Sequence, residues 1–336
     1  MPDQLSAFDL VEAFQLSHAV ATLHNLGLFT TLKEPATADE LSAKYKLNAG
    51  VLRGTLEYVA ARTDLLRKSG DRFVATRKYS DGSRFLLDLY VGAYGGNAAQ
   101  LAKVLRNLSL GVEAVDRSRH ARAFEAVDGS SLGILPQIVR QLGFNHLLDL
   151  GCGNGALLLE LAVKDPNFVG WGMDLNPAMC KTARAGIRAA RYGRRVQVIE
   201  GDCTALSSTL PTKVCNMVRA VTACQVANEL FAAGHVRVVT WLRDLRRVLP
   251  GRPLLIADYY GRLGQGKSRP GKKSAQLERE SMRATLLHDY AQLISGQGVP
   301  PATAAEWRSI YSRSGCSLVH IVEDKTTTRF VHILRL

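Results

Sequence analysis

The 336-residue sequence lacks the long apolar runs that membrane-spanning proteins need. No run approaches the roughly 18 to 20 apolar residues that cross a bilayer. The first ten residues, MPDQLSAFDL, also lack the basic and apolar regions of an export signal, so we expect a cytoplasmic protein. Repeats and low-complexity segments are absent too, and 46% hydrophobic with 22% charged residues excludes a disordered or fibrous chain.

Cysteine and acidic residues are both in short supply. The six cysteines form no CxxC pair and have no Cys/His spacing typical of zinc sites, so we expect reduced thiols and no metal. Thirty acidic against 43 basic residues give a net charge of +13, which fits nucleic acid, an anionic small substrate or solubility alone. A basic cluster at 262–283 has no RNA-recognition aromatics beside it and suits a lid or a solvated loop.

Sequence patterns divide the chain into a helical domain (1–84), a helical connector (85–141) and an α/β domain (142–336). In the first, Thr37 and Glu40 form a capping-box pattern, and two helices precede a hairpin that turns at SGD. This order is typical of a winged helix. The second helix, about 48–66, carries only Arg53 and Arg62 as basic residues, which is too few for a DNA-binding face. We expect the apolar N-terminal helices to form a homodimer.

From residue 145 the chain alternates short apolar runs with amphipathic helices. The runs are HLLDL, FVGWGMDL, VQVIEGD, VCNMVRAV and PLLIADYY, and they predict a parallel sheet with crossover helices. CSLVHIVED and TTTRFVHILRL predict a terminal antiparallel pair. The expected fold is therefore α/β, a Rossmann-like, mostly parallel sheet of seven strands with a helical, winged-helix-like domain before it.

The strongest motif is LLDLGCGNGALLLELA, in which a strand runs through a glycine-rich turn directly into a helix. Such a turn brings the backbone close to a ligand at a helix N-terminus. A second strand ends in Asp174, and a third run leads to Asp202 and Cys203. Acidic residues after neighbouring parallel strands predict a nucleoside pocket at one edge of the sheet.

These residues resemble the class I S-adenosylmethionine (SAM)-dependent methyltransferases, in which a strand ending in Asp precedes GxGxG. The helical N-terminal part resembles the winged-helix dimerisation region of small-molecule O- and C-methyltransferases. An NAD-binding turn would need GxGxxG, whereas position 156 is Ala. By this resemblance, the methionine moiety would be held by Asp149 with Gly151, Gly153 and Gly155. The ribose would be held by Asp174, and the adenine edge by Asp202 with Cys203. From the residues alone, Asp149 also suits a turn former and Cys203 a buried apolar residue.

The expected catalytic base is missing. The related O-methyltransferases carry a His–Asp pair after the fourth strand, where this chain reads VTACQVANE (221–229) without histidine. Three polar side chains there, Gln225, Asn228 and Glu229, are candidates to orient an acceptor; ordinary helix capping is the alternative. Methyl transfer is aided chiefly by in-line alignment, so an absent base does not exclude it.

Further acceptor contacts come from two other segments. The stretch 281–298 resembles the substrate-capping helix of 2-oxo acid C-methyltransferases, which makes His288 a candidate catalytic residue and Tyr290 a candidate substrate contact. A helix-surface histidine is the alternative. In the connector, Tyr94 is a catalytic candidate, with Tyr90 and Asn97 as substrate contacts, unless these aromatic residues only pack helix against helix.

Three functions are consistent with the sequence. The first is methylation of a small anionic or carbonyl-bearing metabolite at carbon, nitrogen or oxygen, with SAM as cofactor and no membrane or nucleic-acid partner. The second uses the aminocarboxypropyl chain of SAM, by transfer or cyclisation, and releases methylthioadenosine. The third, from another class, is a SAM-sensing nucleic-acid-binding protein.

Overall fold

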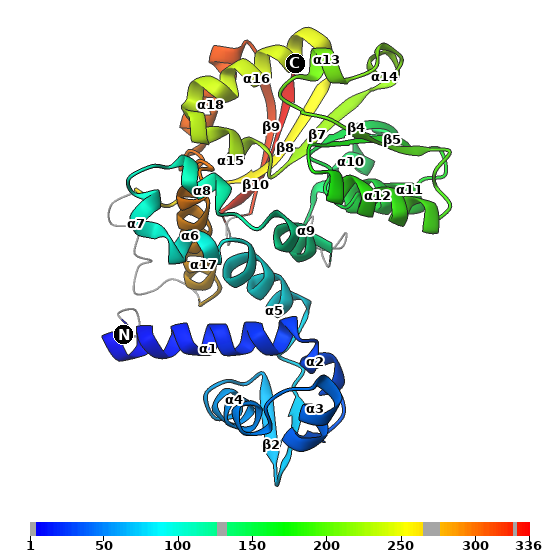
Figure 1. The fold of residues 1–336 in the computed structure, drawn as a ribbon. Helices are drawn as coiled ribbons and strands as arrows, with labels where there is room; N and C mark the ends of the chain where they lie inside the picture. The colour runs from blue at the N-terminus through cyan, green and yellow to red at the C-terminus, as the bar shows by residue number, and fades with distance from the viewer. Residues whose placement is uncertain (1–4, 126–132, 265–275, 325–327) are drawn as a thin grey trace. The chain divides into compact units, whose positions relative to one another are not determined.

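A computed structural model describes residues 5–125, 133–264, 276–324 and 328–336, and these residues form two compact units (Figure 1). The first unit contains residues 1–99 and 115–126, and the second contains 100–114 and 127–336. The segment expected as a connector is therefore shared between the two units. No helix among the described residues is both long and apolar enough to span a membrane.

The first unit begins with helices that enclose a small apolar core. Thr37 and Glu40 form the predicted capping box at the start of a helix, and the predicted hairpin follows the next helix, with its strands antiparallel. Leu28, Leu56 and Val59 are fully buried in the core. The elements are α1 (Ala7–Asn25), α2 (Leu28–Thr31), β1 (Ala36–Thr37), α3 (Ala38–Tyr45), α4 (Ala49–Arg62), β2 (Leu66–Ser69) and β3 (Arg72–Ala75).

The rest of the first unit is helical and is held by a polar cluster. The His24 ring contacts the Tyr79 hydroxyl through Nδ1 (2.6 Å) and the Asp88 carboxylate through Nε2 (3.1 Å). Arg122 pairs with the same carboxylate, so the negative charge of the buried Asp88 side chain is compensated by a cation. The elements are α5 (Asp81–Leu86), the π-helix η1 (Leu87–Ala93), α6 (Gly95–Ala99) and α9 (Arg117–Glu125).

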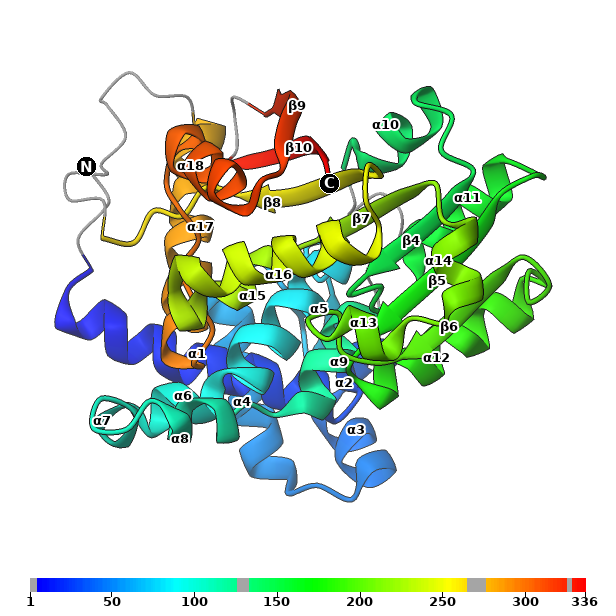
Figure 2. The same cartoon turned by 90° about the horizontal axis from the view of Figure 1, so that it is seen from above.

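The second unit is built on a seven-stranded sheet of order β6-β5-β4-β7-β8-β10-β9 (Figure 2). The first five in this order are parallel, while β10 is antiparallel to both β8 and β9, so the predicted fold and terminal pair are confirmed. The strands are β4 (His146–Leu150), β5 (Val169–Asp174), β6 (Val196–Glu200), β7 (Ala220–Cys224), β8 (Pro253–Tyr259), β9 (Ser317–Glu323) and β10 (Arg329–Arg335).

Helices cover both faces of this sheet. Along β8, Leu254 and Ile256 face one apolar cluster with α16 and α18, whereas Leu255 and Ala257 face the other with α10 and α11. This alternation is what a strand buried on both faces requires. The helices are α7 (Leu101–Val104), α8 (Ser109–Glu113), α10 (Leu135–Gln141), α11 (Ala156–Lys164), α12 (Pro177–Ala189), α13 (Leu206–Thr209), α14 (Thr212–Met217), α15 (Ala227–Leu230), the 3-10 helix η3 (Phe231–Ala233), α16 (Gly234–Val248), α17 (Gln276–Ile294) and α18 (Ala304–Ser314).

One predicted strand was placed too early. The run VCNMVRAV was expected to be extended, but its first four residues belong to α14, and β7 begins only at Ala220. Pro211 precedes this helix as its N-cap with φ near −61°, which suits a helix start. The apolar residues of the run were a correct sign of burial and a wrong sign of strand.

Candidate functional site

The sheet reverses its winding direction between β4 and β7. From β4 the chain proceeds to β5 and then β6 on one side, and afterwards it crosses to β7 and β8 on the other. The loops that leave β4 and β7 therefore diverge at the carboxyl edge, which is where ligands bind in open parallel sheets. Five parallel strands deliver their following residues to this same edge (Figure 2).

The glycine-rich turn lies at the carboxyl end of β4. Gly151 has φ +66°, and a Cβ added there would lie 2.4 Å from Cγ2 of Val226, the second residue after β7. Both the left-handed backbone and this close approach require glycine. Gly153 and Gly155 also have positive φ, and α11 starts directly after them. The turn is thus shaped by backbone and packed against the loop after β7.

Asp149 is buried beside this turn. Its Oδ1 accepts a hydrogen bond of 2.7 Å from the Thr222 hydroxyl on β7, and the residue is only 3% exposed. Burial raises the pKa of this carboxyl to about 7, although the Thr222 bond acts in the opposite direction. Because burial destabilises the ionised form of this carboxyl, a cationic ligand beside it would stabilise that form strongly. Sequence reasoning did not find Thr222, which lies 73 residues away.

Asp174 ends β5 and folds back toward the turn. Its two carboxylate oxygens accept backbone N–H bonds from Gly153 (2.9 Å) and Asn176 (2.8 Å). Burial nevertheless raises the pKa of this carboxyl, because desolvation outweighs the two bonds. Asp149, Asp174 and the three glycines are therefore brought together as the motif predicted.

Asp202 and Cys203 lie two and three residues beyond the end of β6. The Asp202 carboxylate accepts from Thr204 N (2.7 Å), and the Cys203 carbonyl accepts from the Trp241 indole (3.1 Å). Burial raises the pKa of the Cys203 thiol to about 12, so the thiol is neutral, and it packs against the apolar core. A contact of either residue with an adenine ring stays a prediction.

The loop after β7 combines exposed and buried polar groups. Gln225 is exposed with φ +53°, and its N–H donates to the Ala257 carbonyl (2.8 Å); Glu229 is exposed as well. Asn228 is only 1% exposed, and its N–H donates to Oδ2 of Asp258 (3.1 Å). A backbone N–H bond to Asp258 is thus part of what holds the start of α15 to the end of β8.

Asp258 was missed at the sequence level. Its Oδ1 also accepts from Tyr259 N (2.9 Å), and burial raises the pKa of the carboxyl to about 7. The signal was present in PLLIADYY, because Asp258 follows an apolar strand run in the same way as Asp149 and Asp174 do. The same reasoning would have found it.

His288 lies on α17 and is linked through Gln292 to the loop after β7, at the carboxyl edge of the sheet. The His288 Nε2 lies 3.1 Å from Gln292 Nε2, and Gln292 Oε1 accepts from Asn228 Nδ2 at 3.1 Å. The His288 ring lies 5.5 Å from that of Tyr259, the last residue of β8. Tyr290, two residues further on, falls on a different helix face from His288 and is 40% exposed. Gln292 carried no sequence signal.

Asp289 fixes the same helix to the chain after β8. It is fully buried, and its Oδ2 accepts backbone N–H bonds from Arg262 (2.5 Å) and Leu263 (2.9 Å). Burial raises the pKa of its carboxyl, which these two bonds only partly counter. Most of the basic cluster at 262–283 cannot be placed, because residues 265–275 lie outside the described chain.

The candidates of the connector belong to the first unit. The rings of Tyr90 and Tyr94 lie 6.2 Å apart, and Tyr94 lies 6.0 Å from the His120 ring. Asn97 is fully buried. These neighbours fit the packing alternative, and a role for the three residues toward an acceptor stays a prediction.

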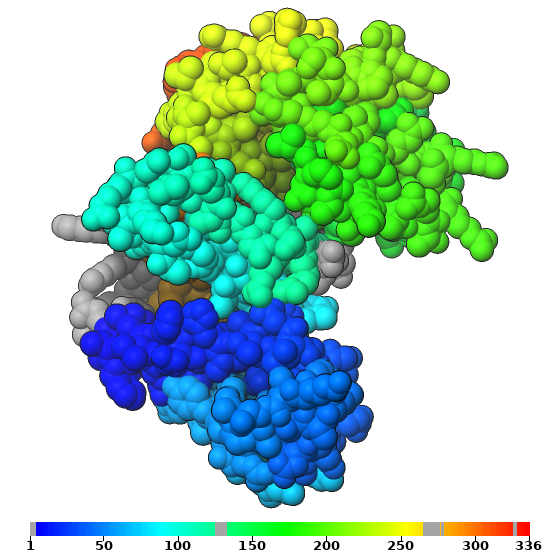
Figure 3. All heavy atoms as spheres, viewed as in Figure 1, coloured from blue at the N-terminus to red at the C-terminus, as the bar shows by residue number. Residues whose placement is uncertain are grey.

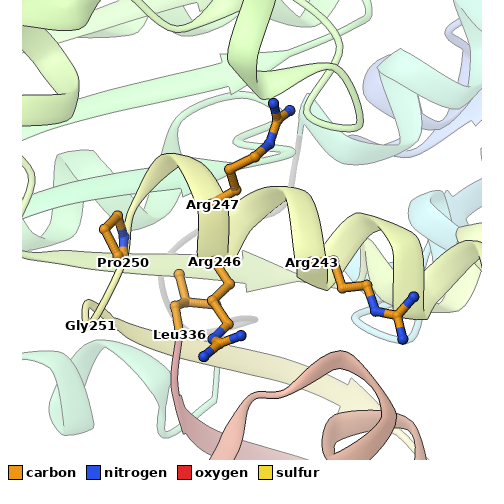
Figure 4. A pocket seen from close by; sticks show the side chains of 6 residues that line it. All are labelled: Arg243, Arg246, Arg247, Pro250, Gly251 and Leu336. Atoms are coloured by element: carbon orange, nitrogen blue, oxygen red, sulfur yellow. The ribbon is translucent and has the colours of Figure 1, made fainter.

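A separate cavity of about 370 Å³ lies near the start of β8 and the end of β10, at the opposite edge of the sheet (Figure 4). Arg246 and Arg247 extend to different sides of α16 there. Arg247 pairs with Asp244, and Arg243 donates to the Arg313 carbonyl (2.8 Å). These arginines do not converge on one point, so the cavity is not a built anion site. Within the described ranges, no three His, Cys, Asp or Glu residues gather closely enough to hold a metal.

Comparison with known proteins agrees with this geometry. Residues 147–249 match the family model of a methyltransferase domain. The 2-ketoarginine methyltransferase of Streptomyces arginensis is 28% identical over 207 residues, which are 59% of this chain and 59% of that protein. The chain thus aligns with less than two thirds of that relative's length.

Solved structures extend the likeness to the whole chain. Human N-acetylserotonin methyltransferase in complex with SAM has a TM-score of 0.73 at 17% identity, covering 100% of this chain and 99% of that one. PigF with SAH has a TM-score of 0.72 at 19% identity, covering 99% and 100%. At such identities the likeness establishes the fold alone.

Proposed function

As the chain carries a class I SAM-dependent methyltransferase domain, we propose that it methylates a small molecule, as natural-product methyltransferases do. The proposal rests on two carboxyl groups, the buried Asp149 and the partly buried Asp174, on either side of a glycine turn at the sheet's switch point. The activity and the acceptor belong to the proposal.

The residues at the ends of β4, β5 and β6 fit SAM by their chemistry; we call them the donor half of the edge. SAM carries an ammonium and a sulfonium cation, and two adjacent carboxyl groups suit a cationic ligand. Asp174 keeps further lone pairs for ribose hydroxyls beside its two backbone bonds. A dinucleotide phosphate would instead meet two carboxyl groups of its own charge. Asp149 with the turn would hold the methionine part, Asp174 the ribose, and the loop with Asp202 and Cys203 the adenine.

The residues at the ends of β7 and β8, together with α17, are proposed to receive the acceptor; we call them the acceptor half. Bound SAM supplies an electrophilic methyl group. The acceptor's electron pair forms the new bond to that carbon while the S–C bond breaks and its pair passes to sulfur. This half aligns the acceptor for in-line attack through His288, Gln225, Asn228 and Glu229.

A carbonyl-bearing, anionic acceptor is the substrate class we propose. A related protein is named for 2-ketoarginine, which carries a keto group. The net charge of +13 favours an anion over a cation as the incoming molecule. The arginines of α4 argue against a nucleic-acid substrate, because both already pair with carboxylates of this chain and not with phosphates. Arg53 pairs with Asp39 (2.8 Å) and Arg62 with Glu12 (2.7 Å).

A homodimer through the N-terminal helix is part of the proposal. Five large apolar side chains of the N-terminal segment are 57–72% exposed: Leu5, Phe8, Leu10, Val11 and Phe14. Four of them belong to α1, which is dark blue in Figure 3, and Leu5 lies just before its first residue. A group of large, exposed apolar side chains of this kind is typical of a protein interface. Light scattering at micromolar concentration should give twice 36.7 kDa, and a monomer would reject this part.

The test of function is mass spectrometry of the nucleoside products. The purified protein is incubated with SAM, with and without a small-molecule extract, and Gly151→Ala serves as the matched inactive control. Extract-dependent S-adenosylhomocysteine supports methyl transfer, and the newly methylated mass identifies the acceptor. Methylthioadenosine formed without an acceptor would replace the proposal by chemistry of the aminocarboxypropyl chain. Binding of duplex DNA or RNA that weakens with salt would favour the nucleic-acid alternative.

A further inference from the structure

Three side chains form a hydrogen-bonded chain that leads from the loop after β7 to His288. Asn228 Nδ2 donates to Gln292 Oε1, and Gln292 Nε2 lies 3.1 Å from His288 Nε2. Asn228 and Gln292 are both buried, at 1% and 3% exposure. The two amides are thus shielded from solvent, so they keep their partners and their orientation.

The direction of the chain follows from the inventory of donors and acceptors. Because Gln292 Oε1 already accepts from Asn228, the amide presents its N–H to His288. A ring nitrogen that faces an N–H donor must be an acceptor, so the proton of a neutral His288 lies on Nδ1. Reversing both amides would put the Asn228 NH₂ where its Oδ1 now lies buried without a partner. An unpaired buried NH₂ is the less favourable of the two, because orphaned N–H donors are rarer in protein interiors than under-satisfied carbonyl oxygens.

The chain is anchored at both ends. Asn228 is held through its backbone N–H by Asp258, and Val226 of the same loop packs against Gly151 of the glycine turn. On the other side, Asp289 holds α17 to the backbone of Arg262 and Leu263. The orientation of the His288 ring is thus fixed relative to the edge at which the donor half lies.

We propose that Asn228 and Gln292 are positioning residues that fix His288 as a neutral imidazole protonated on Nδ1. In this form His288 donates a hydrogen bond to an oxygen of the acceptor, and it is not a general base through Nε2. This inference rests on the proposed methyl transfer for its chemical meaning. The acceptor then reacts as an enol or anion, any proton it releases passes to water, and the Nδ1–H stabilises the oxygen that shares the charge.

The first test measures the tautomer directly and needs no acceptor. Protein labelled with ¹⁵N-histidine is compared as wild type, His288→Asn to assign the signal, and the isosteric variant Gln292→Glu. We expect wild-type His288 to show a protonated Nδ1 and an unprotonated Nε2. A carboxylate at 292 only accepts, so Gln292→Glu should move the proton to Nε2. His320→Asn on exposed β9 is the control and should leave the His288 signals unchanged.

Two results would overturn the inference: a wild-type His288 protonated on Nε2, or tautomers that do not respond to Gln292→Glu. If the buried glutamate prevents folding, Gln292→Met removes the donor without adding a charge, and we then expect both tautomers to be populated. The measurement stays valid if the proposed function fails, because the spectrum detects the protons on the His288 ring and does not depend on turnover.

The second test uses turnover with the acceptor found by mass spectrometry. An asparagine amide can take the place of Nδ1–H, whereas a glutamine amide reaches the place of Nε2. We expect His288→Asn to retain turnover within about 10-fold and His288→Gln to lose roughly 100-fold, the cost of a hydrogen bond to a charged oxygen. Equal, complete loss in both variants would make His288 a base and contradict the inference.

Discussion

The two halves of the carboxyl edge each bury an aspartate, but they hold it in different ways. In the donor half, Asp149 accepts from a side chain, the Thr222 hydroxyl, and Asp174 accepts from the backbone of the turn beside it. In the acceptor half, Asp258 accepts two backbone N–H bonds, and the polar side chains beyond it bond to one another. The donor half is shaped by the glycine turn beside its aspartates, whereas the acceptor half adds a chain of hydrogen bonds between side chains.

This difference suits the two halves to different ligands, the methyl donor in one and the acceptor in the other. A backbone turn with glycines at positive φ fits one ligand and tolerates little change, which suits an invariant methyl donor. Side-chain networks that span 64 residues of sequence, such as Asn228 with Gln292, can be altered singly. Single substitutions can therefore test the two halves separately.

The largest effect on SAM affinity is expected for Gly151→Ala. The new Cβ would lie 2.4 Å from Val226 Cγ2 on a backbone of φ +66°, so crowding and strain add. Together they should cost about 2 to 4 kcal/mol, or roughly 30- to 900-fold in affinity. Gly143→Ala is the matched control, because its φ is +69° with nothing within 4 Å. Calorimetry that finds equal affinities for the two variants would contradict the position of the pocket.

Asp174→Ala should have the next largest effect. It removes the acceptor proposed for the ribose hydroxyls and also frees the Gly153 N–H. We expect SAM affinity to fall by about 1.5 to 3 kcal/mol, roughly 10- to 150-fold. An unchanged affinity would move the ribose elsewhere.

A pH dependence of about tenfold per unit is expected from Asp149. Its pKa of about 7 means that the free protein holds the carboxyl protonated at pH 6, and a cationic ligand must displace that proton. SAM affinity should therefore fall below pH 7, with proton release visible in calorimetry in buffers of different ionisation enthalpy. Asp149→Asn should abolish the dependence, and a variant that keeps it would assign the effect to another group.

The same shift affects stability with a definite sign. Because burial raises the pKa of Asp149 above its unfolded value of 3.8, the folded protein binds more protons than the unfolded chain between about pH 4 and 7. The stabilising contribution is present at low pH and is lost as the pH rises through 7. Thermal unfolding of the ligand-free protein should show a smaller loss between pH 5 and 8 in Asp149→Asn than in wild type.

The smallest effect is expected for Cys203→Ala. The thiol is neutral and packs against the core, so its loss should change SAM affinity by less than about threefold and stability by about 1 kcal/mol. Binding measured beside thermal unfolding separates the two. A loss of affinity comparable to that of Asp174→Ala would give the thiol a direct ligand contact.

The donor half could be predicted from sequence because its parts are local. Asp149 and three glycines fall within seven residues, and Asp174 ends the next strand, so strand order alone brings them together. In the acceptor half the sequence offered Asn228 and His288 as candidates but not the Gln292 side chain that joins them, since Gln292 reaches Asn228 only through the packing of α17 on the sheet edge, which no periodicity encodes. Asp258 was missed although it could have been predicted, because it follows an apolar strand run just as Asp174 does. The start of β7 was misplaced because burial was read as extension.

The most direct test of this division is calorimetric titration of SAM into three proteins at one pH: wild type, Gly151→Ala and His288→Ala. The account predicts that Gly151→Ala loses most of the affinity, while His288→Ala binds within about twofold of wild type and fails only in turnover. SAM binding lost as strongly in His288→Ala as in Gly151→Ala would contradict the separation of donor and acceptor halves.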